Sequence, residues 1–358
     1  MTDFRNSACP TIALAAAFAL TTLALPISAA RADDVSLVET GSTLLFPLFK
    51  VWVAEYTKTH PGIHIATNAT GSGVGIEQAI SGAAHIGTSD AYMSDTQARQ
   101  HPQIINVPMA ISALTVNYNL PGLNGTNLKL DGPVLADIYK GKIRAWDDKA
   151  IAALNPDVKL PHQDIIPVHR ADGSGDSFVF TQYLTFSTPS WENDIGFGTT
   201  IAWPSVPGGL NAEGNLGVLQ LVQKTPYSIG YLGVSFHAEI AEASLGTASL
   251  KSYSGEYLLP SPATVEAAAA ALTPRTPSDE RLTLVDAPGA NAYPLVNYEY
   301  AVVSTKQANP ETAAALRKFL LWAIAPDEIN EKLLDDAHFI PLPAHIWVLS
   351  HDQIETIK

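Results

Sequence analysis

The sequence predicts an α/β protein with two lobes, each a mixed sheet flanked by helices. Short apolar strand patterns alternate with helical patterns along the chain, which is typical of α/β architecture with largely parallel pairing. The chain has 358 residues, more than one hydrophobic core usually organises, so two lobes are expected. Three of the strands also run directly into Gly/Ser/Thr turns that open helices.

The N-terminus has the pattern of a secretory signal peptide, predicted at residues 1–32. Arg5 precedes an apolar run over residues 11–27, and Ala30-Arg31-Ala32 supplies an A-x-A cleavage site. The alternative, a membrane anchor, is disfavoured because the run is shorter than the roughly 20 residues of a spanning helix. Cys9 precedes the apolar run, whereas a lipoprotein would need its cysteine just after that run. We therefore expect an exported chain that is cleaved after Ala32.

The charge of the chain excludes some classes of partner. The full sequence has 21 basic and 35 acidic residues. Removal of residues 1–32, which contain Arg5, Arg31 and Asp3, leaves 19 basic and 34 acidic residues and a net charge of −15. Such an acidic protein is not expected to bind nucleic acid or anionic membranes.

Three strand–turn–helix units carry the strongest functional signal. The strands at residues 35–39, 63–66 and 165–168 lead into turns at 40–43, 70–73 and 170–177. The first backbone N–H groups of a helix have no intrahelical partner, and the helix dipole is positive there. One such turn would be an ordinary helix cap. Three of them, one carrying Arg170, predict a binding site for an oxyanion.

The remaining elements follow from periodicity and from start and stop signals. Further strands are expected at residues 85–89, 107–118, 228–234 and 298–304. Helices are expected at residues 44–57, 75–81, 133–140, 177–185, 216–223, 262–272 and 310–323. Loops are expected at residues 204–217, rich in Pro, Gly and Asn, and at residues 274–278, rich in Pro.

No low-complexity linker separates the lobes. The chain is therefore expected to change lobe within continuous apolar strands, near residues 113–117 and again near 294–298. This gives a discontinuous first lobe, residues 33–112 plus 296–358, and a second lobe, residues 113–295. A hinge of two strands would join them.

The turns supply a cation and neutral hydrogen-bond donors. Arg170 can present a bidentate fork to an oxyanion. Asp172 could hold that guanidinium in place, or it could equally be the N-cap of the following helix. Neutral donors would come from the hydroxyls of Thr43, Ser72 and Ser174 and from the N–H groups of Leu44 and Gly175. Taken alone, each hydroxyl could be a plain helix cap.

Asp90, at the end of a strand, bears on which anion is bound. An ionised aspartate is only an acceptor, so it favours an anion that carries a proton. Hydrogen phosphate has a P–OH to donate, whereas sulfate at neutral pH has none and would be repelled. Without the three turns, Asp90 would be read as a surface turn residue.

The ordered motifs of the chain resemble those of the periplasmic phosphate-binding proteins of ABC transporters, the PstS family. The resemblance runs from about Leu37 to Leu342. It rests on the segments at residues 41–47, 71–75, 86–90, 114–122, 135–143, 146–148, 170–180 and 228–231. It implies a type II periplasmic binding protein fold with a two-stranded hinge. It also implies a monomeric, cofactor-free periplasmic receptor that binds inorganic phosphate and delivers it to an ABC permease without turning it over.

By this resemblance, nine residues would form the site. Phosphate would be lined by Thr43, Leu44, Ser72, Asp90, Arg170, Ser174, Gly175 and Asp176, with Asp172 paired to Arg170. Many relatives have Thr at the position of Asp176. The carboxylate here would be a second proton acceptor or a repulsive charge.

Three alternative functions compete with this one. A secreted phosphatase or other hydrolase lacks support, because the sequence has neither a Gly-x-Ser-x-Gly nucleophile elbow nor a Walker A motif. A receptor for another oxyanion, such as sulfate or molybdate, is disfavoured by Asp90 and Asp176, since two acceptors need a protonated ligand. A surface adhesin using the same fold is neither supported nor excluded by the composition.

Overall fold

The computed structural model describes residues 34–358. The predicted signal peptide, residues 1–32, lies outside the described residues. Among residues 34–358, none of the helices combines the length and the apolar character that crossing a bilayer requires.

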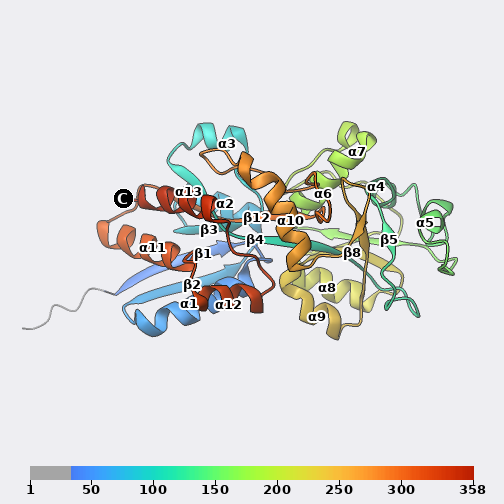
Figure 1. The fold of residues 1–358 in the computed structure, drawn as a ribbon, viewed down its shortest axis with the longest axis horizontal. Helices are drawn as coiled ribbons and strands as arrows, with labels where there is room; N and C mark the ends of the chain where they lie inside the picture. The colour runs from blue at the N-terminus through green and yellow to red at the C-terminus, as the bar shows by residue number, and fades with distance from the viewer. Residues whose placement is uncertain (1–33) are drawn as a thin grey trace, which may run out of the picture. The chain divides into compact units, whose positions relative to one another are not determined.

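One large sheet runs through the molecule (Figure 1), with strand order β2-β1-β3-β12-β4-β8-β6-β7 and with β9 beside β4. Its strands are β1 Val35–Gly41, β2 Ile63–Ala69, β3 Ile86–Ser89, β4 Ile104–Tyr118, β6 Ile166–Arg170, β7 Leu210–Ala212, β8 Ser228–Gly233, β9 Gly246–Thr247 and β12 Val296–Ser304. A small second sheet has the order β11-β10-β5, formed by Tyr257–Leu258, Ser249–Lys251 and Lys129–Leu130.

The large sheet is mixed, as predicted, although the expectation that its pairing is largely parallel was wrong. Strand β1 is parallel to β2 and β3, and β6 is parallel to β7 and β8. Strands β4 and β12, in contrast, are antiparallel to each other and to their other neighbours in the main strand order. The reason is that β4 and β12 carry the chain across the molecule in opposite directions.

Strand β4 changes partner part-way along its length. Ala113 pairs with Val296 of β12, and the next residue, Leu114, pairs with Gly233 of β8. In Figure 1, β4 extends from the part of the molecule that contains β1–β3 to the part that contains β8. This change of partner lies within the segment where the sequence predicts that the chain crosses between lobes. The lobe boundaries themselves remain a prediction.

The helices of the described residues vary widely in length. They are α1 Phe46–Thr59, α2 Ser72–Ser81, α3 Asp95–Gln100, α4 Gly132–Tyr139, α5 Lys149–Leu154, α6 Gly175–Ser187, α7 Pro189–Asp194, α8 Gly214–Lys224, α9 His237–Glu242, α10 Pro262–Leu272, α11 Pro310–Ala323, α12 Glu328–Asp336 and α13 Ala344–Glu355.

Local capping signals explain which helix boundaries were predicted correctly. Helices α10 and α11 match the expected ranges at both ends. Ser261 and Thr264 form a reciprocal capping box at α10, and the Asn309 side chain accepts from the N–H of Thr312 at α11. Proline at the first position of both helices is already set to the helical φ.

Other boundaries differ because tertiary contacts decide them. Helix α1 begins at Phe46 rather than at residue 44, since the Ser42 hydroxyl accepts from the N–H groups of Leu44 and Leu45 and holds them in a turn. The expected loop at residues 204–217 contains β7 and the start of α8. Residues of low strand propensity form β7 because the free edge of β6 pairs with them. The sequence also did not predict α3, α5, α7, α9, α12 and α13.

Helix α6 is buried almost along its whole length, which fixes the position of its N-terminus. Its residues from Gly175 to Thr185 are all buried. Phe180 of α6 stacks on Tyr231 of β8, with ring centroids 4.5 Å apart, and contacts Tyr139 of α4. A helix packed on all sides in this way cannot turn its first residues aside without disturbing the core.

Candidate functional site

The turns that open α2 and α6 are in direct contact. The N–H of Gly73 donates to the carbonyl of Gly173 across 2.8 Å. Gly71 has a φ of +91°, and a Cβ on it would lie 2.5 Å from a carboxylate oxygen of Asp172. Glycine is therefore required at position 71 for both backbone conformation and space. Two of the three predicted turns thus meet in space, although about a hundred residues separate them.

Asp90 lies at the end of β3 and is buried, with 2 % of its surface exposed. Its carboxylate accepts hydrogen bonds from the hydroxyls of Ser42 and, at 3.2 Å, of Ser72. A Cβ on Gly175 would lie 2.3 Å from Asp90 Oδ2, so the first turn of α6 packs directly on this carboxylate. The reading of Asp90 as a surface turn residue is therefore wrong.

Arg170, the last residue of β6, is also buried and is held by two carboxylates. Its Nε donates to Asp172 Oδ1 across 2.7 Å, and its Nη2 donates to the other oxygen of Asp172. Its Nη1 donates to Asp176. Asp172 also accepts from the N–H of Gly214 at 3.1 Å. Asp172 thus orients the guanidinium, while the N-cap of α6 is Ser174, whose hydroxyl accepts from the N–H of Ser177.

Asp176, in the first turn of α6, is the most constrained of the carboxylates. Its Oδ2 accepts from Arg170, from Asn215 Nδ2 at 2.9 Å and from the Ser174 hydroxyl at 3.4 Å. Its Oδ1 is buried and has no hydrogen-bond partner within residues 34–358. One oxygen of Asp176 is therefore held by three protein donors, whereas the other has none among residues 34–358.

Burial and mutual contact shift the pKa values of Arg170, Asp172 and Asp176. Burial raises the pKa of Asp176; Arg170 opposes this rise, and Asp90 and Asp172 add to it, so the net shift is upward. Burial favours a higher pKa for Asp172, but the hydrogen bonds and the charge of Arg170, together with the N–H of Gly214, outweigh burial and hold this pKa below its usual value. Burial would lower the pKa of Arg170, but Asp176 and Asp172 keep it above its usual value. Arg170 thus stays charged.

Asn215, in the first turn of α8, belongs to the site and was missed. Its Nδ2 donates to Thr43 Oγ1 at 2.8 Å and to Asp176, and its Oδ1 accepts from the N–H of Gly233 at 2.8 Å. Asn215 thus links Thr43, in the turn before α1, to Asp176, in the first turn of α6. The sequence does not point to Asn215 because the segment around it is rich in Gly and Pro, which predicts a loop. Its position just before an apolar helical pattern was the available signal.

Ser42 and Glu299 were also missed. The Ser42 hydroxyl accepts from the N–H groups of Leu44 and Leu45 in the turn before α1 and also donates to Asp90. Glu299 of β12 is buried and accepts from the Ser112 hydroxyl at 2.5 Å and from Asn297 Nδ2 at 2.9 Å. Burial and the nearby Asp90 raise the pKa of Glu299 well above its usual value. Nothing in the sequence around Glu299 distinguishes it from an ordinary strand residue.

All nine predicted site residues lie in one connected cluster. Leu44 joins it through its backbone: its N–H donates to Ser42 Oγ at 3.1 Å, and its carbonyl accepts from Ser235 at 2.7 Å. The cluster contains one cation, Arg170, and the buried hydroxyl groups of Ser42, Thr43, Ser72 and Ser174. Among residues 34–358, no group of three or more His, Cys, Asp or Glu side chains is arranged to hold a metal ion.

Comparison with known proteins gives consistent matches. A family model described as a PBP superfamily domain matches residues 27–327. The phosphate-binding protein PstS of Methanocaldococcus jannaschii is 32% identical, covering 93% of this chain and 89% of that protein. The phosphate-binding protein PstS of Haemophilus influenzae is 31% identical, covering 95% of this chain and 96% of that protein.

Solved structures with this fold are more distant in sequence. A high-affinity periplasmic phosphate-binding protein (PfluDING) bound with phosphate has a TM-score of 0.71 at 19% identity, covering 88% of this chain and 92% of that one. A phosphate-binding protein from Stenotrophomonas maltophilia has a TM-score of 0.67 at 18% identity, covering 89% of this chain and 93% of that one. These likenesses confirm the predicted fold class, a two-lobed type II binding-protein fold.

Proposed function

This chain belongs to the PstS family of the PBP superfamily, and on that premise we propose that it is a receptor for inorganic phosphate. The observation that carries the proposal is the buried cluster in which the turns before α1, α2 and α6 meet around Arg170 and Asp90. The bound phosphate would lie between two lobes, residues 33–112 plus 296–358 and residues 113–295. The receptor would deliver it to the permease of an ABC importer.

Each class of residue in the cluster has a distinct role in this proposal. Arg170, oriented by Asp172, supplies the positive charge. The first-turn N–H groups of α6, together with Leu44 and the hydroxyls of Thr43, Ser72 and Ser174, supply neutral donors. Dipoles of this kind, fixed in a buried site, can hold an anion even in a protein of net negative charge. Surface charges farther than about 8–10 Å away are screened by salt.

Asp90 and Asp176 would make the site selective for a protonated anion. An ionised carboxylate beside the ligand is favourable only where the ligand has a proton to donate. Phosphate has one or two such protons near neutral pH and sulfate has none. The Oδ1 of Asp176 is buried and has no partner among residues 34–358. This supports the role of Asp176 as a second acceptor, beside Asp90, for a proton of the ligand.

In this proposal, the protein is a monomeric, cofactor-free receptor and not an enzyme. The predicted signal peptide and the family support a periplasmic location. A secreted phosphatase is the competing function. Turnover of a generic phosphomonoester by the purified protein, abolished by Ser174→Ala, would favour the phosphatase.

Calorimetric titration of the mature chain tests the proposal. The protein is stripped of ligand and titrated with phosphate, arsenate and sulfate. We expect one phosphate per chain with micromolar or tighter affinity, about −8 kcal/mol or better, and much weaker binding of sulfate. An absence of both binding heat and thermal shift with phosphate would overturn it.

A further inference from the structure

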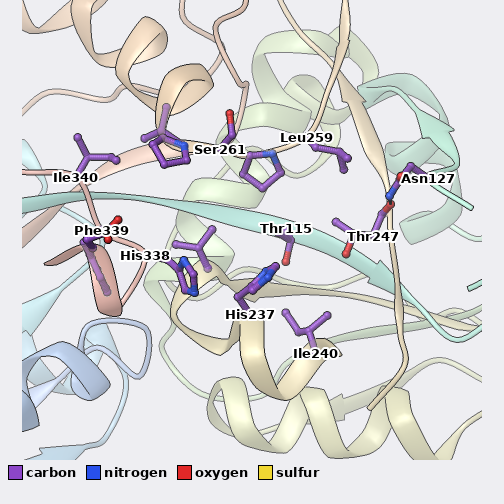
Figure 2. A pocket seen from close by; sticks show the side chains of 15 residues that line it. Thr115, Asn127, His237, Ile240, Thr247, Leu259, Ser261, His338, Phe339 and Ile340 are labelled. Atoms are coloured by element: carbon purple, nitrogen blue, oxygen red, sulfur yellow. Dashed lines mark hydrogen bonds between the residues drawn. The ribbon is translucent and has the colours of Figure 1, made fainter. Parts of the chain in front are cut away.

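A cavity lies away from the phosphate cluster. Its volume is about 410 Å³, which falls in the range of small-molecule sites. Fifteen residues line it, and Figure 2 shows His237 of α9 beside His338, which follows α12. Their ring centroids are 4.9 Å apart. His237 belongs to the predicted second lobe and His338 to the first, so the cavity spans the predicted lobe boundary.

The interior of the cavity is apolar. Val234, Ile240, Val265 and Phe339 are buried residues of its wall. Several polar lining groups are already paired within the protein: the Thr115 hydroxyl donates to Asn117, and Thr247 Oγ1 accepts from Asn117 Nδ2. The wall therefore favours a ligand with an apolar body.

The polar groups available to a ligand are at the rim. Both imidazoles are exposed, and Asp335 lies beside them. Burial and the neighbouring His237 lower the pKa of His338, while Asp335 partly opposes this, so that ring is neutral at pH 7. A neutral imidazole can donate to or accept from a hydroxyl group, whereas Asp335 would repel a carboxylate.

We propose that this cavity binds a small neutral aromatic molecule bearing one hydroxyl group. The ring would fill the apolar interior, and the hydroxyl would hydrogen-bond to His237 and His338 at the rim. The ligand class follows from three features of the cavity: its volume, its apolar wall and its pair of imidazoles beside one carboxylate.

The position of the cavity couples this ligand to phosphate. Side chains alternate between the two faces of a strand, so Thr115 and Ser112 of β4 face opposite sides. Thr115 lines the cavity, and Ser112 bonds to Glu299 behind Asp90. Separation of the lobes on the phosphate side would therefore narrow the cavity on the other side. A ligand that fills the cavity should favour the closed, phosphate-binding arrangement, and this coupling must be reciprocal. This step rests on the proposed function.

The test uses 2-naphthol as the probe, with fluorescence titration of the mature protein in the absence of phosphate. We expect saturable binding with a dissociation constant below about 1 mM, a modest affinity for a ligand of this size. Val265→Phe, which fills the cavity, should abolish it. His237→Phe, which keeps the ring and removes the nitrogens, should weaken 2-naphthol binding by about 2- to 12-fold, as expected for a lost hydrogen bond.

Matched ligands and a phosphate titration complete the test. Naphthalene, which lacks the hydroxyl, should bind wild type and His237→Phe equally, and 2-naphthoate should bind more weakly than 2-naphthol. Saturating 2-naphthol should tighten phosphate binding by about fivefold or more in wild type. It should leave the phosphate affinity of Val265→Phe unchanged. Absence of saturable binding, or equal binding by wild type and Val265→Phe, overturns the site. Binding without an effect on phosphate affinity overturns the coupling. A protein that binds 2-naphthol but not phosphate would instead contradict the proposed function.

Discussion

At the scale of single residues, Arg170 is the strong cation of the cluster and is fixed on both sides by carboxylates. We expect Arg170→Ala to weaken phosphate binding by about 2–5 kcal/mol, the usual cost of truncating one partner of a buried charge pair. Lysine should restore binding only in part, because it lacks the fork geometry. Calorimetry on both variants measures the effect.

Arg281→Ala is the matched control for this prediction. Arg281 pairs with Asp95 and Asp279, carboxylates that are both more than half exposed. Its removal should leave phosphate affinity unchanged, since it makes none of the contacts of the cluster. Phosphate binding by Arg170→Ala at wild-type strength would exclude the arginine from the ligand's surroundings.

The two acidic acceptors carry a second prediction, about selectivity. Asp90→Asn replaces an obligate acceptor with an amide that can also donate, so sulfate should gain affinity relative to phosphate. Asp176→Thr should change selectivity less, because the backbone N–H at position 176 remains. Competition titrations of phosphate against sulfate measure the ratio of the two affinities in each variant.

The same two residues predict a dependence of binding on pH. If both carboxylates accept protons from the ligand, the phosphate monoanion is favoured over the dianion. Binding should then weaken as the pH rises through the phosphate pKa, and it should weaken less in Asp176→Thr. Identical pH profiles for wild type and Asp176→Thr would show that Asp176 does not contact the ligand.

At the scale of elements, the site depends on how closely the N-terminus of α6 approaches β3. A Cβ on Gly175 would lie 2.3 Å from Asp90 Oδ2 and 2.5 Å from Ser72 Oγ. Both neighbours are buried and hydrogen-bonded to each other, so neither can move aside freely. We expect Gly175→Ala to displace the first turn of α6 and to weaken phosphate binding by about tenfold or more, a loss of about 1.4 kcal/mol.

Gly125→Ala is the control for this steric argument. A Cβ on Gly125 would meet nothing within 4 Å, so both phosphate affinity and thermal stability should stay as in wild type. Unchanged phosphate affinity in Gly175→Ala would mean that α6 does not approach Asp90 as closely as described.

At the scale of the whole molecule, buried carboxyl groups set how stability varies with pH. Burial raises the pKa of Glu280 from 4.5 to about 8, although Ser350 and Gln353 donate hydrogen bonds to it. Between these two values the unfolded chain releases a proton that the folded chain keeps. The contribution of Glu280 to folding stability is therefore greatest below pH 4.5, and it falls as the pH rises to about 8.

We expect Glu280→Gln to reduce this pH dependence. The amide resembles the protonated carboxyl group and does not ionise, so the variant should lose less stability than wild type between pH 5 and pH 8. One proton accounts for a slope of up to about 1.4 kcal/mol per pH unit. Urea unfolding at pH 5 and at pH 8 measures this loss of stability. Glu266→Gln, at an exposed position on α10, is the control. Equal slopes in wild type and Glu280→Gln would contradict the prediction.

The sequence by itself determined the features that depend on near neighbours. The ends of α10 and α11 follow from Ser261, Asn309 and the prolines after them. The pairing of Arg170 with Asp172 joins residues only two positions apart. Hydrogen bonds of this kind form within a few residues, so their pattern can be read directly from the chain.

Only the tertiary structure decided which distant groups complete the site. Asn215 bonds to Thr43, 172 residues away, and Ser112 bonds to Glu299, 187 residues away. Neither pair has a local pattern, because each is created by the packing of β4, β8, β12 and α8. The strand order of the large sheet and the cavity lined by His237 and His338 have the same origin. Which strands become neighbours depends on the packing of the whole chain, and periodicity along the sequence does not encode it.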